Sequence, residues 1–260
     1  MEHYKQMIRK INSHTNSQVK HVVKLHNAKQ RNACQEFIAE GFRTISTIIQ
    51  ARHEPITIFT IEEYLHDSLQ LAPENKVVVV ALSVMEKMST TKSPSGILAV
   101  FKIPQKPAFK SIKSGVVLAQ INDPGNAGTL IRTAAAMNKN TIIFIESVDA
   151  WNPKVVQASA GAIGHVTIFS MSWNELIQHK QNLILCALVS AEGKNPSSIN
   201  LDNTLLIVGN EGNGIPQEWV AQCEERITLP MPGNFESLNA AVAGSIALYL
   251  AATQIIKNPS

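Results

Sequence analysis

The order of hydrophobic segments along the chain predicts an α/β protein. In the N-terminal part, short apolar runs rich in valine and isoleucine are typical of strands, and they lie at 54–61, 76–82 and 96–103. Ahead of them, Val19, Val22, Val23 and Leu25 recur at helical spacing, so residues 17–41 are predicted to form one basic amphipathic helix. A helix combined with several strands predicts a small α/β domain.

The C-terminal part alternates more regularly between apolar runs and helical segments. Strands are predicted at 115–122, 140–147, 165–171, 182–190, 204–210 and 226–231. Helices are predicted at 129–138, at 154–163 and from about Ser237 to Ile256. This alternation of continuous apolar runs with helices predicts a mostly parallel, doubly wound sheet. The apolar stretch 240–252 is too short and too rich in small residues to cross a bilayer, so it is predicted to be a buried helix.

A polar stretch separates the two parts of the chain. Residues 104–114 contain two prolines, three lysines and few apolar residues, which is typical of a linker. The sequence therefore predicts an N-terminal domain of residues 1–103 and a C-terminal domain of residues 115–260.

Composition is that of an ordinary globular protein, with 45% hydrophobic and 17% charged residues in a chain of 260. The cysteines Cys34, Cys186 and Cys223 are far apart and form no CxxC pair, so neither a disulfide framework nor a zinc site is expected. The eight histidines show no spacing typical of a metal site either. A reducing cytoplasm fits this cysteine usage best.

The net charge of +3 is unevenly distributed, with +7 over residues 1–113 and −4 over residues 114–260. The N-terminal basic residues include Lys20, Lys24, Lys29 and Arg31. A basic segment of this kind commonly binds nucleic acid, because neutralising phosphates releases counterions. A solvated basic surface without a partner is the alternative that charge alone leaves open.

Three glycine- and asparagine-rich loops follow predicted strands. They are NDPGNAG at 122–128, GNEGNG at 209–214 and MPGNFESLN at 231–239. Ligands of open parallel sheets bind outside the carboxyl ends of the strands, so the three loops predict one shared site. Each loop alone can also be a simple tight turn, in which glycine and asparagine accept positive φ.

The glycine pattern does not match the common phosphate-binding motifs. Gly209 to Gly214 has the GxxxxG spacing of a phosphate loop, but Ile215 and Pro216 follow where that loop needs lysine and serine or threonine. A dinucleotide fingerprint would need a third glycine and a place after the first strand of the domain. Glycine backbone without a cation is better suited to a phosphate-free ligand, such as an adenosine group held by main-chain hydrogen bonds.

In order and spacing, three segments resemble the three motifs of the SpoU family of RNA ribose methyltransferases, within the SPOUT superfamily. They are NDPGNAGTLIRTA at 122–134, IVGNEGNGI at 207–215 and LPMPGNFESLN at 229–239. EGFRTI at 40–45 and STTKSPSGILAV at 89–100 resemble the substrate-binding domain that precedes the catalytic domain in this family. The resemblance covers nearly the whole chain, and it adds Arg43 to the residues expected to contact RNA.

The resemblance implies a C-terminal SPOUT domain with a mostly parallel sheet and a trefoil knot, preceded by a small α/β RNA-binding domain. It implies S-adenosylmethionine as cofactor and a homodimer whose sites lie near the interface. The reaction that it implies is methyl transfer to a ribose 2′-hydroxyl. The family's cofactor contacts correspond to Gly209, Leu229, Leu238 and Asn239.

The resemblance also implies which polar residues form the catalytic site, and these are Asn126, Arg132, Glu211, Ser237 and Asn239. The family arginine, here Arg132, is described as a general base. Since a guanidinium resists deprotonation, an alternative is that Arg132 anchors a phosphate and stabilises the developing alkoxide. We therefore expect an RNA 2′-O-methyltransferase that acts on ribosomal RNA. A transfer-RNA methyltransferase with the same chemistry and a non-catalytic RNA-binding protein on the same fold are the alternatives.

Overall fold

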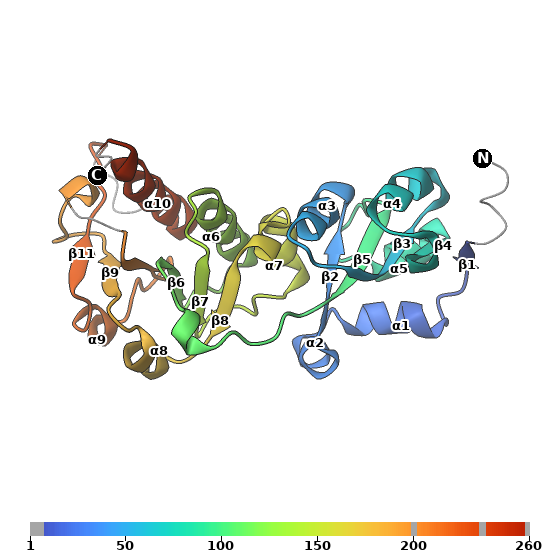
Figure 1. Ribbon diagram of the computed structural model, residues 1–260, viewed down its shortest axis with the longest axis horizontal. Coiled ribbons are helices and arrows are strands. Elements are labelled where there is room, and N and C mark those ends of the chain that lie inside the picture. The colour runs from blue at the N-terminus through green and yellow to red at the C-terminus, as the bar shows by residue number, and fades with distance from the viewer. Residues whose placement is uncertain (1–7, 199–201, 234–237, 258–260) are drawn as a thin grey trace. The chain divides into compact units, whose positions relative to one another are not determined.

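The computed structural model describes residues 8–198, 202–233 and 238–257, which divide into two compact units (Figure 1). Unit 1 comprises Met1–Gln105 and Trp151–Gly164, and unit 2 comprises Lys106–Ala150 and His165–Ser260. Residues 151–164 thus pack with the N-terminal unit, although the sequence analysis placed them in the C-terminal domain. The rings of Phe37 and Trp151 lie 4.7 Å apart between centroids, inside unit 1.

Unit 1 is built on a five-stranded sheet with the order β1-β4-β3-β5-β2. Its strands are β1 (Arg9–Ile11), β2 (Glu36–Glu40), β3 (Pro55–Thr60), β4 (Val77–Val80) and β5 (Ile97–Lys102). Its helices are α1 (Ser17–Lys24), α2 (Ala28–Cys34), α3 (Phe42–Gln50), α4 (Leu65–Leu71), α5 (Leu82–Met88) and α7 (Pro153–Ala158). Strand β5 is antiparallel to β2 and β3, and the other pairs are parallel. The predicted small α/β domain is confirmed.

The prediction of a single helix over residues 17–41 is wrong, because α1, α2 and strand β2 share this segment. Asn27 starts a second helix, since its side chain accepts a hydrogen bond from the backbone N–H of Lys29 at 2.8 Å. Gln35 has a left-handed φ of 53° and ends α2. The next five residues then enter the sheet as β2, a segment too short for its pattern to distinguish a strand from a helix.

Unit 2 is built on a six-stranded sheet with the order β11-β9-β10-β6-β7-β8. Its strands are β6 (Gly115–Ala119), β7 (Thr141–Ile145), β8 (Thr167–Ser170), β9 (Ile184–Leu188), β10 (Thr204–Val208) and β11 (Glu225–Ile227). Its helices are α6 (Pro124–Ala136), α8 (Trp173–His179), α9 (Gln217–Val220) and α10 (Ala240–Lys257). Every neighbouring pair of strands is parallel. The predicted parallel sheet is confirmed.

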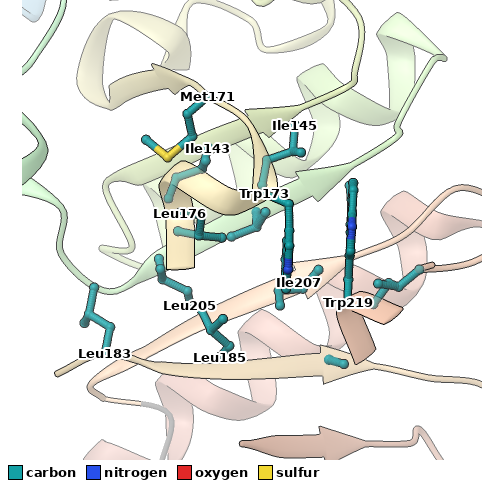
Figure 2. Packing of buried hydrophobic residues seen from close by; sticks show 14 of the residues in the cluster. Ile143, Ile145, Met171, Trp173, Leu176, Leu183, Leu185, Leu205, Ile207 and Trp219 are labelled. Atoms are coloured by element: carbon teal, nitrogen blue, oxygen red, sulfur yellow. The ribbon is translucent and has the colours of Figure 1, made fainter. Parts of the chain in front are cut away.

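The core of unit 2 holds α9 against the sheet. Figure 2 shows the indole rings of Trp173 and Trp219 stacked among isoleucine and leucine side chains of the strands. The ring centroids are 4.9 Å apart and the planes differ by 2°. Because Trp219 is 6% exposed, this stack fixes the short helix that follows the loop at 209–214.

Helix α10 lies beside α6 (Figure 1). A Cβ atom on Gly244 would lie 2.5 Å from Leu130 Cδ2, so glycine at this position leaves room for the side chain of Leu130 between the two helices. The expectation that α10 is buried is only partly correct. Val242, Ile246 and Tyr249 are 46%, 40% and 57% exposed and share one face. Among the helices that the structure describes, none is long and apolar enough to cross a membrane.

Candidate functional site

A pocket of about 440 Å³ opens at the carboxyl edge of the sheet of unit 2. Leu188 and Val208 are the last residues of β9 and β10, and both line it. The glycine-rich loop 209–214 forms another part of the wall, and Leu229 and Leu238 contribute to its apolar part. The pocket is within the size range of small-molecule and cofactor sites.

The loop 209–214 is held by its own main chain. The N–H of Asn210 donates to the carbonyl of Gly214 at 3.1 Å, and the N–H of Gly214 donates back at 2.9 Å. Gly214 has a φ of +66°. A Cβ atom on Gly209 would lie 2.4 Å from the carbonyl carbon of Gly214. The glycine at 209 is therefore required by packing of the loop against itself.

The first glycine-rich segment lies next to this loop. The side chain of Asn210 donates from Nδ2 to the carbonyl of Gln120 at 2.9 Å, directly after β6. Asp123 caps α6 by accepting from the N–H of Asn126 at 2.8 Å. The side-chain amide of Asn126 donates in turn to the carboxylate of Glu211. The structure thus brings together two predicted site residues, of which Glu211 lines the pocket and Asn126 contacts it through Glu211.

The third segment contributes Leu229, Met231 and Leu238 to the pocket lining. Asn239 is placed differently, because its side-chain oxygen accepts from the N–H groups of Ala241 at 2.9 Å and Val242 at 3.2 Å. It therefore caps the start of α10. Ser237, the other polar residue predicted here, lies outside the described residues.

Arg132 does not line the pocket of its own chain. It is exposed on α6, six residues and hence about 9 Å along the helix from Asn126. Within the described part of the chain it forms no ion pair. The guanidinium is therefore available to a molecule outside this chain.

The charge of the pocket restricts what it can bind. No lysine, arginine or histidine is among the described residues that line it, and Glu211 is the ionisable one. A phosphate group would find no counter-charge at this wall, whereas a positively charged ligand is tolerated.

Burial raises the pKa of Cys186 and of Cys223 to about 12, so both stay protonated at neutral pH and neither serves as a nucleophile.

Comparison with known proteins assigns this arrangement to a family. The model of the SpoU rRNA methylase family matches residues 113–249, and that of the MRM3-like substrate-binding domain matches residues 16–99. The chain belongs to the SpoU rRNA methylase family. Membership confirms the predicted family and the class of enzyme, an RNA methyltransferase.

Three relatives illustrate how much of the chain is shared. An uncharacterised tRNA/rRNA methyltransferase of Synechocystis is 30% identical, over 95% of this chain and 94% of that protein. The 23S rRNA (guanosine(2553)-2′-O)-methyltransferase of Bacillus subtilis is 25% identical, over 93% and 98%. The crystal structure of an AdoMet-bound rRNA methyltransferase from Sinorhizobium meliloti is 24% identical, with a TM-score of 0.81 over 94% and 97%. The predicted two-part fold is confirmed, and the trefoil knot stays a prediction.

The SpoU site includes residues that sequence reasoning missed. Ser190, which follows β9, and Gln217, at the start of α9, both line the pocket. The predicted strand at 182–190 is followed by a glycine at 193, so the rule that ligands bind at carboxyl ends of strands applied to it as well. Gln217 carries no such signal in the sequence.

The basic candidates of unit 1 divide into exposed and buried residues. Lys20, Lys24, Lys29 and Arg43 are exposed. Arg31 is 2% exposed, and its Nη1 donates to the carbonyls of Leu25 and His26, each at 2.8 Å. The guanidinium of Arg31 thus holds the C-terminal end of α1, and we do not retain it as an RNA contact.

Proposed function

We propose that this SpoU methylase transfers a methyl group from S-adenosylmethionine to a ribose 2′-hydroxyl of ribosomal RNA. The observation that carries the proposal is the pocket wall, in which a glycine-rich main chain and leucine side chains enclose about 440 Å³, with no cation among the described residues that line it. An adenosyl group has apolar faces and polar edges but no phosphate. Its sulfonium is positively charged, which suits a pocket in which Glu211 is the ionisable one of the described lining residues.

The residues fit the cofactor by their chemistry. Gly209, Leu229 and Leu238 line the pocket and would hold the adenosyl group by backbone and apolar contacts, while Asn239 would act by fixing the start of α10. When bound, S-adenosylmethionine supplies an activated methyl group. The remaining task of the protein is alignment of the ribose, which can supply about 7–11 kcal/mol of the barrier.

We assign Arg132 to the ribose and its adjacent phosphate. A guanidinium can bind a phosphate through two hydrogen bonds and stabilise a developing alkoxide, and it keeps its proton in proteins. Asn126 and Glu211 are already hydrogen-bonded to each other and would position the ribose at the pocket wall. Ser237, outside the described residues, stays a predicted residue of the catalytic site.

We further propose a homodimer formed through the exposed face of α10. Val242, Ile246 and Tyr249 place apolar surface on one side of this helix, and a second copy offers the matching surface. Tyr249→Asp should convert the dimer to a monomer in light-scattering measurements. Leu82→Asp, at a residue of unit 1 that is equally exposed at 57%, should leave the mass unchanged.

In such a dimer we propose that Arg132 serves the pocket of the partner, because it does not line its own. Mixed dimers of Arg132→Ala and Gly209→Ala test this directly. At an S-adenosylmethionine concentration too low to fill the Gly209→Ala pocket, each variant alone should have little activity, whereas a mixed dimer should regain one working site. If mixing restores no activity although mixed dimers form, Arg132 acts within its own chain.

Ribosomal RNA is preferred as the substrate because the chain belongs to an rRNA methylase family and matches a 23S rRNA methyltransferase over nearly its whole length. The cytoplasm, where ribosomal RNA is available, is the proposed location. A transfer-RNA substrate would need the same pocket, so mapping of 2′-O-methyl sites in total RNA with and without the gene decides between them. A methyl group lost from transfer RNA alone would overturn the preference.

Calorimetry of the purified protein tests the pocket itself. We expect S-adenosylmethionine to bind and ATP, which carries the same adenosine with three phosphates, to bind at least tenfold more weakly. Labelled methyl groups should then appear in ribosomal RNA. Failure to bind S-adenosylmethionine together with failure to label RNA would leave the non-catalytic RNA-binding alternative.

A further inference from the structure

A buried carboxylate in unit 1 holds the loop at residues 89–96. Glu40, the last residue of β2, is 7% exposed. Its carboxylate accepts hydrogen bonds from the hydroxyls of Ser89 at 2.8 Å and Thr91 at 3.1 Å, and from the N–H of Ser95 at 3.1 Å. No lysine or arginine in the described residues forms an ion pair with it. Since a buried carboxylate is costly unless its oxygens are satisfied, the loop and Glu40 stabilise one another.

Two glycines fix the geometry on either side of this carboxylate. Gly41 has a φ of +89° and turns the chain from β2 into α3. Gly96 has a φ of +80°, and a Cβ atom there would lie 2.4 Å from the ring of Tyr64. Neither position accepts another residue without strain. The end of the loop and the start of α3 are thus each set by a glycine with positive φ.

The start of α3 and the loop at residues 89–96 carry an exposed aromatic ring and two exposed cations. Phe42, the first residue of α3, is 40% exposed, and Arg43 next to it is exposed as well. Lys92 is exposed and directly follows Thr91, whose hydroxyl binds Glu40. Neither cation forms an ion pair with another described residue. Phe42 and Arg43 thus lie within three residues of Glu40, and Lys92 lies within three residues of groups that Glu40 binds.

We propose that Phe42, Arg43 and Lys92 form a binding site for an unpaired nucleotide of the RNA substrate. The base stacks on the Phe42 ring, while Arg43 and Lys92 bind the flanking phosphates. The net charge of +5 over unit 1, which has 14 lysines and arginines and nine acids, favours a polyanion over an apolar protein partner. An unpaired base is required because bases inside a duplex do not expose their faces. The inference rests on the proposed function, in that it places part of the RNA in unit 1.

Binding of RNA by the full-length protein tests the stacking. The probes are a mixed-sequence single-stranded RNA and the same strand annealed to its complement, each followed by fluorescence anisotropy. Phe42→Ala should weaken single-strand binding about tenfold and duplex binding less than twofold. Phe42→Trp should restore the affinity, and its added fluorescence should be quenched by the bound base. Ile56→Ala, a control at a side chain of unit 1 that is 38% exposed, should change neither.

The salt dependence of binding tests the cations. Arg43→Ala and Lys92→Ala should each reduce the slope of log K against log salt for the single strand by about 0.7. Arg9→Ala, an equal loss of charge on β1, should leave the slope unchanged. Equal effects of all three variants would mean general attraction, and would overturn the site. Unchanged RNA binding in the Phe42→Ala, Arg43→Ala double variant would also overturn it and leave this surface to a protein partner.

The failure of this site is distinguishable from failure of the proposed function. If the unmodified protein methylates ribosomal RNA but Phe42→Ala has the same KM for RNA, only the stacking site is wrong. If the unmodified protein binds no S-adenosylmethionine and transfers no methyl group, the enzyme assignment is wrong, whatever the oligonucleotides show.

Discussion

Residues 209–214 of unit 2 and residues 89–96 of unit 1 both form loops beside the carboxyl ends of strands, but different groups hold them. The first loop is closed by main-chain hydrogen bonds between Asn210 and Gly214. The second is held by the side chain of Glu40. The first loop offers backbone to a ligand, whereas the second offers side chains.

This difference suits the two proposed ligands. A cofactor has a constant shape, so a wall of main chain can match it without charged side chains. An RNA substrate is a polyanion with unpaired bases, so cations and an aromatic ring bind it better. We therefore expect substitutions in unit 2 to change the chemical step or cofactor binding, and substitutions in unit 1 to change the affinity for RNA.

The largest expected effect is a loss of kcat without a loss of affinity for RNA. Arg132→Ala should lower kcat about 100- to 1000-fold, because a group that stabilises charge in the transition state is removed. The Kd for S-adenosylmethionine and the Kd for RNA should change less than threefold. Single-turnover methyl transfer gives kcat, and Arg226→Ala, another exposed arginine of unit 2, is the control. Near-normal turnover in Arg132→Ala would show that the catalytic arginine is misplaced.

A second prediction concerns a methyl group added to the glycine-rich loop 209–214. Gly209→Ala should weaken S-adenosylmethionine binding at least tenfold, because its Cβ would lie 2.4 Å from the backbone of Gly214. Gly212→Ala is the matched control, since its Cβ would approach only Asn210 Oδ1, at 3.5 Å. Calorimetry measures both affinities. Equal losses in the two variants would show that flexibility, and not packing, is what this loop needs.

The complementary experiment in unit 1 removes the carboxylate. Glu40→Ala should destabilise the protein by about 1–3 kcal/mol, because the hydroxyls of Ser89 and Thr91 lose their acceptor. It should raise KM for RNA while kcat and cofactor affinity stay unchanged. Denaturant unfolding and steady-state kinetics measure the two effects. Glu63→Ala, an exposed acid of unit 1, is the control, and Glu40→Gln provides a milder variant if the alanine protein does not fold.

The smallest expected effect is a pH dependence of the stability, caused by Glu36 in unit 1. Burial alone would raise the pKa of Glu36, but hydrogen bonds from Lys102 at 2.8 Å and His21 at 2.6 Å outweigh it, and the pKa lies below 4.5. The stabilisation from Glu36 is therefore complete above the unfolded-state pKa and is lost as the pH falls through the folded-state pKa.

Since the side chains of Lys102 and His21 are 66% and 41% exposed, Glu36 should contribute less than about 1 kcal/mol to the free energy of unfolding. Thermal melts at pH 7 and at pH 3 measure it. Glu36→Gln should reduce the difference between these two melting temperatures, and Glu54→Gln, at a carboxylate side chain that is 86% exposed, should not. A difference that is the same in both variants would assign the acid sensitivity to other groups.

Much of unit 2 could be predicted because its pattern is repetitive. Continuous apolar runs that alternate with helices locate all six of its strands, and the glycine-rich segments locate the pocket wall. Asn126 and Glu211 followed from the motifs, and they are hydrogen-bonded in the structure. Helix α8 and the pocket residue Gln217 were not predicted, because short helices after a strand carry little periodicity.

Unit 1 was harder to predict because its elements are short and their ends are set by single residues. Asn27 and Gln35 divide the segment predicted as one helix, and neither is visible in the hydrophobic pattern. Arg31 has the charge of an RNA contact but lies inside the fold, where its guanidinium binds two carbonyls. Charge alone cannot distinguish these two environments, since both stabilise a guanidinium.

The packing of residues 151–164 with unit 1 affects how the protein can be divided. Strand β2 lies against α7, and Phe37 lies against Trp151. A fragment that stops at residue 103 would expose the surface that α7 covers and lose an aromatic neighbour. Cleavage between residues 104 and 114 would also leave residues 151–164 covalently joined to unit 2. Separate folding studies of the RNA-binding part would therefore need this second segment added back, for instance through a short loop after residue 105.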